Sequence, residues 1–127
     1  MPLRPAQSRA GAVKNGDSAS GKEGLTMNIF DLPELLLAEE LTTVLAEGDC
    51  ARIERIVSTG QISDWYDQAE TEFIVLLEGS AVIEYDNGHT LKMKKGDTLL
   101  VTPHEKHRVS FTSSATPCVW LCVFYGK

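Results

Sequence analysis

Residues 60–79, with the sequence GQISDWYDQAETEFIVLLEG, contain the pattern that decides the fold. Between its two end glycines, Tyr66 and Gln68 stand two residues apart, and Glu72 follows four residues later. In a β-strand, side chains two apart point to the same face, so Tyr66 and Gln68 can face a barrel interior while Asp67 faces outward. The stretch therefore predicts one wall of a polar centre inside a β-structure.

Around this stretch the chain is organised in short β-rich runs separated by turn residues. The strongest turn signal is Asp86-Asn87-Gly88, because Asn-Gly accepts the positive φ angles that a tight hairpin needs. Seven such runs within about 75 residues are typical of a β-sandwich or a small barrel. The predicted strands are residues 51–58, 72–77, 80–85, 90–93, 98–102, 108–112 and 119–125.

The N-terminal part, residues 1–48, differs from the rest in its composition and in the spacing of its apolar residues. Between residues 29 and 45, apolar residues recur at spacings compatible with one or two short helices, in which Pro33 fits an early position and Gly48 fits the end. Residues 1–26 contain no aromatic residue and cannot bury enough apolar surface to become ordered. We expect residues 1–26 to be a disordered leader or tail, with an organelle transit peptide as another alternative, and residues 27–127 to be one domain.

Composition excludes several classes of function. The 127 residues include 12 basic and 18 acidic side chains, and a net charge of −6 disfavours nucleic-acid binding. No apolar stretch approaches the roughly 20 residues of a membrane helix, so we expect no membrane partner. The N-terminus does not resemble a secretory signal, and an odd number of cysteines, three, favours reduced thiols. These features predict a cytoplasmic protein.

The spacing of the opening stretch has a counterpart in a known family. It runs Gly60, five residues, Tyr66, one residue, Gln68, three residues, Glu72, six residues, Gly79. This pattern resembles the first cupin motif, in which histidines occupy the positions of Tyr66 and Gln68. Both glycines and the glutamate keep their places, and only the two histidines are replaced.

A second motif of the same family maps further along the chain. In the family it runs glycine, five residues, proline, one residue, glycine, two residues, histidine, three residues, asparagine, and only Gly96 and His107 match it literally. The equivalent positions here are Gly96, Thr102, His104, His107 and Phe111. The resemblance covers about residues 28–125 and implies an all-β, cupin-type jelly-roll barrel of short antiparallel strands, with the one or two short helices at its N-terminal end.

A typical metal-binding cupin holds one divalent ion with three histidines and one glutamate, and this chain offers Gln68, Glu72 and His107 instead. An amide oxygen is a weak ligand for first-row metals, and the Tyr66 phenol binds well only when ionised. His104 can complete the set only by leaning inward from its turn. We expect either no metal or a weakly bound divalent ion, and the donors do not distinguish Zn, Fe, Mn and Ni.

The run that begins near His107 supplies the opposite wall of the expected centre. His107, Val109 and Phe111 alternate with Arg108 and Ser110, so they share one face of a strand. One histidine and two apolar side chains would then line a cavity with few polar groups. The residues predicted to contact a ligand are Tyr66, Gln68, Glu72, His107, Val109 and Phe111.

Three functions are compatible with this set. The first is a cupin that binds a small organic ligand in the barrel interior with weak metal or none. The second is a metal-dependent enzyme of isomerase or oxygenase type that uses Gln68, Glu72 and His107, with Glu72 and His107 as the candidate catalytic pair. The third is a structural or regulatory module with a filled interior. The resemblance also implies a homodimer.

Overall fold

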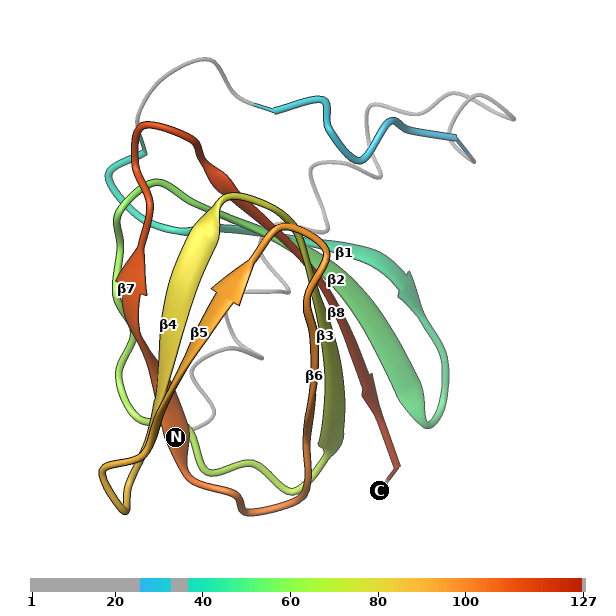
Figure 1. Ribbon diagram of the computed structural model, residues 1–127. Helices are drawn as coiled ribbons and strands as arrows, with labels where there is room; N and C mark the ends of the chain where they lie inside the picture. The colour runs from blue at the N-terminus through green and yellow to red at the C-terminus, as the bar shows by residue number, and fades with distance from the viewer. Residues whose placement is uncertain (1–25, 33–36, 127) are drawn as a thin grey trace.

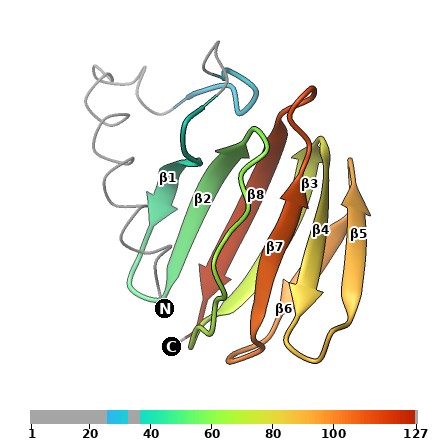
Figure 2. The same ribbon diagram turned by 90° about the vertical axis from the view of Figure 1, so that its left-hand side faces the viewer.

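The computed structural model describes residues 26–32 and 37–126. In this part of the chain, antiparallel strands form a five-stranded sheet in the order β1-β2-β8-β3-β6 and a three-stranded sheet in the order β5-β4-β7. Figures 1 and 2 show the two sheets facing each other. The strands are β1 (Leu41–Glu47), β2 (Ala51–Ser58), β3 (Thr71–Glu78), β4 (Ser80–Tyr85), β5 (Thr90–Lys94), β6 (Thr98–Val101), β7 (His107–Thr112) and β8 (Cys118–Tyr125).

The hydrophobic core lies between the two sheets and draws side chains from every strand except β1. Alternation along β3 shows the principle: Glu72 and Ile74 are buried, whereas Phe73 between them is exposed. The last strand, β8, lies between β2 and β3, so it is central in its sheet and not an edge. The core cluster consists of Ile56, Ile74, Leu76, Ala81, Ile83, Met93, Val101, Val109, Cys118, Trp120, Cys122 and Phe124.

All seven predicted strands are confirmed, as β2 to β8. Residues 51–58 and 80–85 coincide with β2 and β4, and each other strand begins and ends within one residue of its predicted bounds. The all-β, antiparallel barrel is confirmed with them. The boundaries are accurate because glycine, proline and Asp-Asn-Gly segments interrupt the chain at each turn.

The helical prediction is wrong for residues 41–47, which form strand β1. β1 pairs antiparallel with β2, and a register shift between Val44 and Ala46 leaves Leu45 as an extra residue. The spacing of apolar residues around this bulge resembled a helical period, but pairing with β2 outweighs such a weak local preference. Residues 29–32 and 37–40, which belong to the same helical prediction, are not helical either, whereas residues 33–36 and residues 1–25 of the predicted leader lie outside the described residues.

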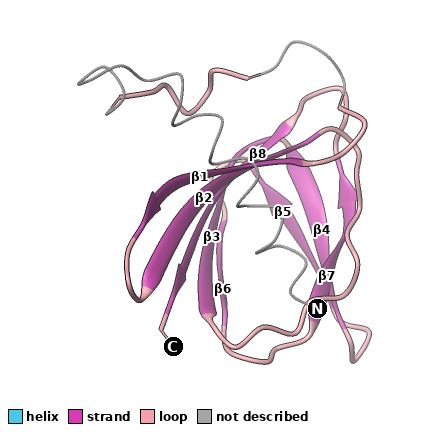
Figure 3. Cartoon of the chain, turned by 180° about the vertical axis from the view of Figure 1, so that it is seen from behind, coloured by secondary structure: helices cyan, strands magenta, loops and turns pink. Residues whose placement is uncertain are grey.

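No described residue belongs to a helix, as Figure 3 shows from behind. Accordingly, the described part of the chain contains no helix of the length and apolarity that crossing a membrane requires.

A β-bulge in β7 changes which side chains face the interior. Ile83 pairs with Val109 and Val82 pairs with Phe111, so Ser110 is inserted without a counterpart on β4. The extra residue reverses the alternation: Val109 is buried, whereas Phe111 is 49% exposed on the outer face. The prediction that Phe111 shares the inner face with Val109 is therefore wrong, because a strict period of two fails at a bulge.

Gly79, the last glycine of the first motif, lies where β3 passes into β4. Its φ is +91°, and a Cβ added there would lie 2.8 Å from both the Cys118 Cα and the Pro117 carbonyl oxygen. Gly88 in the β4–β5 turn has nearly the same φ, +92°, but no atom within 4 Å of an added Cβ. Gly79 is therefore required both for its backbone conformation and for close approach to another chain segment.

Two glycine variants separate these effects. Gly88→Ala should cost about 1–2 kcal/mol of unfolding free energy through its left-handed backbone alone. Gly79→Ala should cost at least about 2 kcal/mol more, because backbone atoms must also move. Urea unfolding followed by tryptophan fluorescence measures both values, and equal losses would contradict the close approach.

The bulge in β7 leads to a second prediction. Val109→Ala should lower the unfolding free energy by roughly 2 kcal/mol, because it removes buried methyl groups and leaves a cavity. Phe111→Ala removes a larger side chain but should cost less than about 1 kcal/mol, because that side chain lies on the surface. A greater loss for Phe111→Ala in the same urea titration would place Phe111 inside the barrel.

Candidate functional site

Glu72 on β3 and His107 on β7 line one enclosed space between the sheets. Both are fully buried, with exposures of 0% and 1%. The space measures about 10 Å³, which is room for about one water molecule. The lining residues are Glu40, Ile56, Glu72, Ile74, Ile83, His107, Val109, Trp120 and Cys122, so the walls are mainly apolar apart from two carboxylates and one imidazole.

His107 is held from two directions. Its backbone exchanges two hydrogen bonds with Tyr66: the Tyr66 N–H donates to the His107 carbonyl at 2.7 Å, and the His107 N–H donates to the Tyr66 carbonyl at 3.1 Å. Its ring Nδ1 lies 2.8 Å from the Glu105 carbonyl oxygen. A carbonyl only accepts hydrogen bonds, so Nδ1 carries a proton and the neutral ring has its basic nitrogen at Nε2.

Glu72 is positioned by Gln68, which lies four residues earlier in the segment before β3. The Gln68 Nε2 donates a hydrogen bond to the Glu72 Oε1 at 3.2 Å. Gln68 is only partly buried, whereas Glu72 is completely buried. Gln68 therefore presents an N–H group to the carboxylate, and this contact orients Glu72.

The described donors do not fit a four-ligand metal site. Gln68 turns its amide N–H toward Glu72, and no group of three or more His, Cys, Asp or Glu side chains in residues 26–32 and 37–126 is arranged to hold a metal ion. His104 does not complete the set: its side chain is 67% exposed, and its Nδ1 lies 2.7 Å from the Asp67 carboxylate. His104 itself has a φ of +61°, and this left-handed backbone conformation in the turn directs its side chain away from the interior.

Of the other residues predicted to contact a ligand, Val109, Phe111 and Tyr66, only Val109 lines the interior space. Phe111 lies on the outer face of its sheet. Tyr66 is 3% exposed and its ring centroid lies 5.6 Å from that of His107, but Tyr66 does not line the space. Tyr66 therefore packs behind the histidine and supports its orientation.

Glu40 is a lining residue that sequence reasoning missed. It lies just before β1, and its Oε2 accepts a hydrogen bond from the Ser58 hydroxyl at 3.3 Å. The Trp120 indole N–H also donates to Ser58, at 3.2 Å. In the sequence, Glu40 falls within the stretch predicted as one or two short helices. Its inward position depends instead on the contact with Ser58 on β2, which is distant in the sequence.

A second buried ionic group was also missed. The Arg52 Nε lies 2.6 Å from Glu54 Oε2, and Arg52 Nη1 lies 3.3 Å from Glu70 Oε2. The Arg52 guanidinium is 4.3 Å from the centroid of the Phe124 ring. The sequence does contain a signal for this ion pair: Arg52 and Glu54 have opposite charges and stand two residues apart in an apolar strand, so they share one face.

Comparisons with known proteins agree with this architecture. The family model described as the cupin domain matches residues 56–124. A crystal structure of a Ralstonia eutropha JMP134 protein, provisionally designated a mannose-6-phosphate isomerase, is 35% identical, with a TM-score of 0.76 over 80% of this chain and 98% of that chain. No curated protein sequence matches the chain.

Two more distant structures share the fold. A cupin superfamily protein from Desulfitobacterium hafniense DCB-2 is 20% identical, with a TM-score of 0.66 over 75% of this chain and 84% of that chain. The polyketide cyclase RemF from Streptomyces resistomycificus is 17% identical, with a TM-score of 0.64 over 80% of this chain and 79% of that chain.

The family match includes β3 to β7 completely and most of β8, the strands that supply Glu72, His107 and the core around them. Together with the two motif spacings and the similarity to the Ralstonia protein, this match shows that the chain belongs to the cupin domain family.

Proposed function

We propose that this cupin binds a small polar organic molecule through Glu72 and His107 in the barrel interior. The observation that carries the proposal is the complete burial of both titratable side chains on the walls of one mainly apolar space. Burying such groups costs free energy, and sites that bind small molecules commonly combine apolar walls with a few placed polar groups. Perturbed or buried titratable groups of this kind mark candidate functional sites.

Charge and volume restrict the ligand. Glu40 and Glu72 supply two carboxylates, and no lysine or arginine is among the described residues that line the space. This set favours a neutral or cationic ligand with hydrogen-bond donors over a phosphate. A phosphate such as the mannose 6-phosphate in the designation of the Ralstonia protein is therefore disfavoured at this centre. Because the space holds about one water, an organic ligand enters only when wall side chains move.

The same geometry supports an alternative function, in which the protein is an enzyme and Glu72 and His107 act as general acid and base. Glu72 is held by Gln68, and His107 is held through Nδ1 by the Glu105 carbonyl. A carboxylate and an imidazole that are each held in a fixed orientation are side chains of the types that act as general acid and base in isomerisations. In this alternative Glu72 and His107 exchange protons with the ligand, while Gln68 and Glu105 only position them.

A structural or regulatory module is the second candidate, and the small volume of the interior favours it. About 10 Å³ is far below the several hundred cubic ångströms typical of small-molecule pockets. In this case Glu72 and His107 form part of a packed polar core.

Glu72→Gln tests the proposal against both candidates. It removes the charge with little change in volume, and Glu47→Gln on β1 is the control with the same charge change at an exposed position. Native mass spectrometry of the full chain, purified without chelator, should show a small organic adduct in the wild type and in Glu47→Gln. The adduct should fall at least about tenfold in Glu72→Gln, as expected for a lost buried contact.

The other outcomes identify the alternatives. A stoichiometric divalent metal in elemental analysis would support the metal-dependent enzyme. An unliganded wild-type chain, together with a lower unfolding free energy in Glu72→Gln, would support the structural module.

We also propose that two copies associate through the outer face of the five-stranded sheet. An apolar row crosses four neighbouring strands there, because the registers align Leu100 with Phe73, Phe73 with Val123, and Val123 with Ile53. Leu100 and Phe73 are 50% and 38% exposed. This row carries no charge, so copies with a net charge of −6 can approach here with little repulsion.

Light scattering coupled to size exclusion tests the assembly. At micromolar concentration the wild type should have twice the chain mass of 13.9 kDa. Phe73→Asp should give the single mass, because a charge would be buried at the interface. Phe111→Asp, at a phenylalanine on the outer face of the other sheet that is 49% exposed, should leave the mass unchanged. A wild type of single mass would contradict the dimer.

A further inference from the structure

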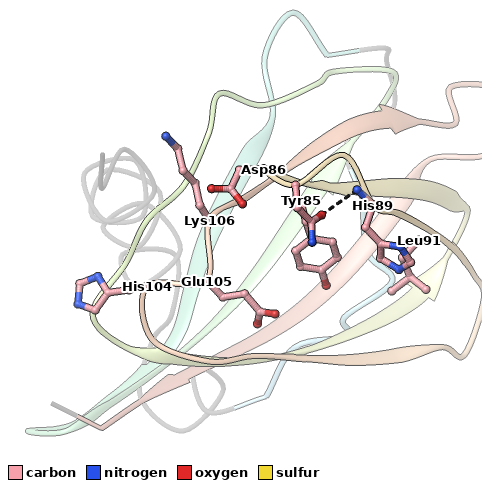
Figure 4. A pocket seen from close by; sticks show the side chains of 8 residues that line it. Tyr85, Asp86, His89, Leu91, His104, Glu105 and Lys106 are labelled. Atoms are coloured by element: carbon pink, nitrogen blue, oxygen red, sulfur yellow. Dashed lines mark hydrogen bonds between the residues drawn. The ribbon is translucent and has the colours of Figure 1, made fainter.

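A second cavity, of about 440 Å³, lies between the β4–β5 hairpin and the loop that precedes β7. We refer to it as the mouth pocket, since both segments lie at the lower end of the barrel in Figure 1. Figure 4 shows its lining side chains. They are those of Tyr85, Asp86, Asn87, His89, Leu91, His104, Glu105 and Lys106.

The mouth pocket has an apolar floor formed by Tyr85 and Leu91. Both side chains are half-buried and pack against the core cluster between the sheets. Tyr85 is also the register partner of His107, whose ring bonds to the Glu105 carbonyl. The mouth pocket is therefore adjacent to the interior centre, but neither His107 nor Glu72 lines it.

The carboxylate of Glu105 is fixed at the wall of this pocket. Its Oε1 accepts hydrogen bonds from the Thr102 N–H at 3.1 Å and from the Thr102 hydroxyl at 3.3 Å. Burial, and secondarily the negative charge of Glu105, raise the pKa of Tyr85 above its ordinary value. The Tyr85 phenol thus stays neutral beside the carboxylate.

Neither the Lys106 nor the His104 side chain is directed at this carboxylate. Figure 4 shows the Lys106 ammonium pointing away from Tyr85 and Glu105. His104 also points away, and its imidazole bonds to the Asp67 carboxylate at 2.7 Å. The pocket therefore combines a fixed negative group, an aromatic ring and an aliphatic side chain.

We propose that the mouth pocket binds the ammonium group of a small aliphatic amine. The ammonium forms an ion pair with the Glu105 carboxylate beside the Tyr85 ring, and the alkyl chain packs on Leu91. Carboxylates and aromatic faces both attract ammonium groups, and partial desolvation strengthens both interactions. The inference is separate from the proposed role of Glu72 and His107, because those residues lie outside this pocket.

Three probes of equal length test the assignment. The full chain, labelled with ¹⁵N, is titrated with n-butylammonium, n-butanol and butyrate, and amide shifts are followed by NMR. Butylammonium should shift the amides of Asn87, His89 and Glu105, with an affinity at least about fivefold higher than that of butanol. Butyrate should cause no shift at these amides. Equal affinity for the three probes, or shifts only elsewhere, would overturn the assignment.

A matched pair of variants isolates the carboxylate. Glu105→Gln keeps an oxygen that can accept the Thr102 hydrogen bonds but removes the charge, and it should weaken butylammonium binding at least about fivefold. Asp49→Asn, at an exposed position in the β1–β2 turn, makes the same change in net charge and should bind as the wild type does. If Glu105→Gln binds butylammonium as tightly as the wild type, the proposal is wrong.

Discussion

The attachment of residues 61–68 to β7 is the interaction on which the candidate site depends. Tyr66 and His107 exchange two backbone hydrogen bonds, Ser63 bonds to Val109 through both its backbone N–H and its hydroxyl, and the Thr112 hydroxyl donates to the Gln61 carbonyl. These bonds cover the edge of β7 that β4 does not pair. They also join the two motifs, so Glu72 and His107, 35 positions apart in the sequence, reach the same space.

The interior contains more polar groups than core packing requires. Glu72, His107 and the Arg52–Glu54 pair are all buried, yet each has a defined hydrogen-bond or ionic contact. Replacement of buried ionic groups by apolar residues is often neutral or stabilising, so these groups do not by themselves explain the stability of the barrel. The mouth pocket and the small central space share no lining residue, but Tyr85 of the mouth pocket pairs in register with His107 of the central space.

Much of the fold could be predicted because turns and strand patterns are local. The strands β2 to β8 follow from short β-rich runs between glycine, proline and asparagine turns, and the glycine and glutamate spacing identified the family. Three features could not be predicted, since each depends on a partner strand. Leu41–Glu47 is a strand because it pairs with β2, Phe111 faces outward because Ser110 bulges against β4, and Glu40 turns inward toward Ser58.

The sequence by itself determined the mainly β class, the boundaries of β2 to β8 and the residue types available for a polar centre, because alternation and turn chemistry act over a few residues. Tertiary structure alone decided which of these residues meet. It brought Glu72 and His107 to one space, turned His104 to the surface and closed the interior to about 10 Å³. These outcomes depend on strand register and on bulges, which are set by contacts between segments distant in the chain.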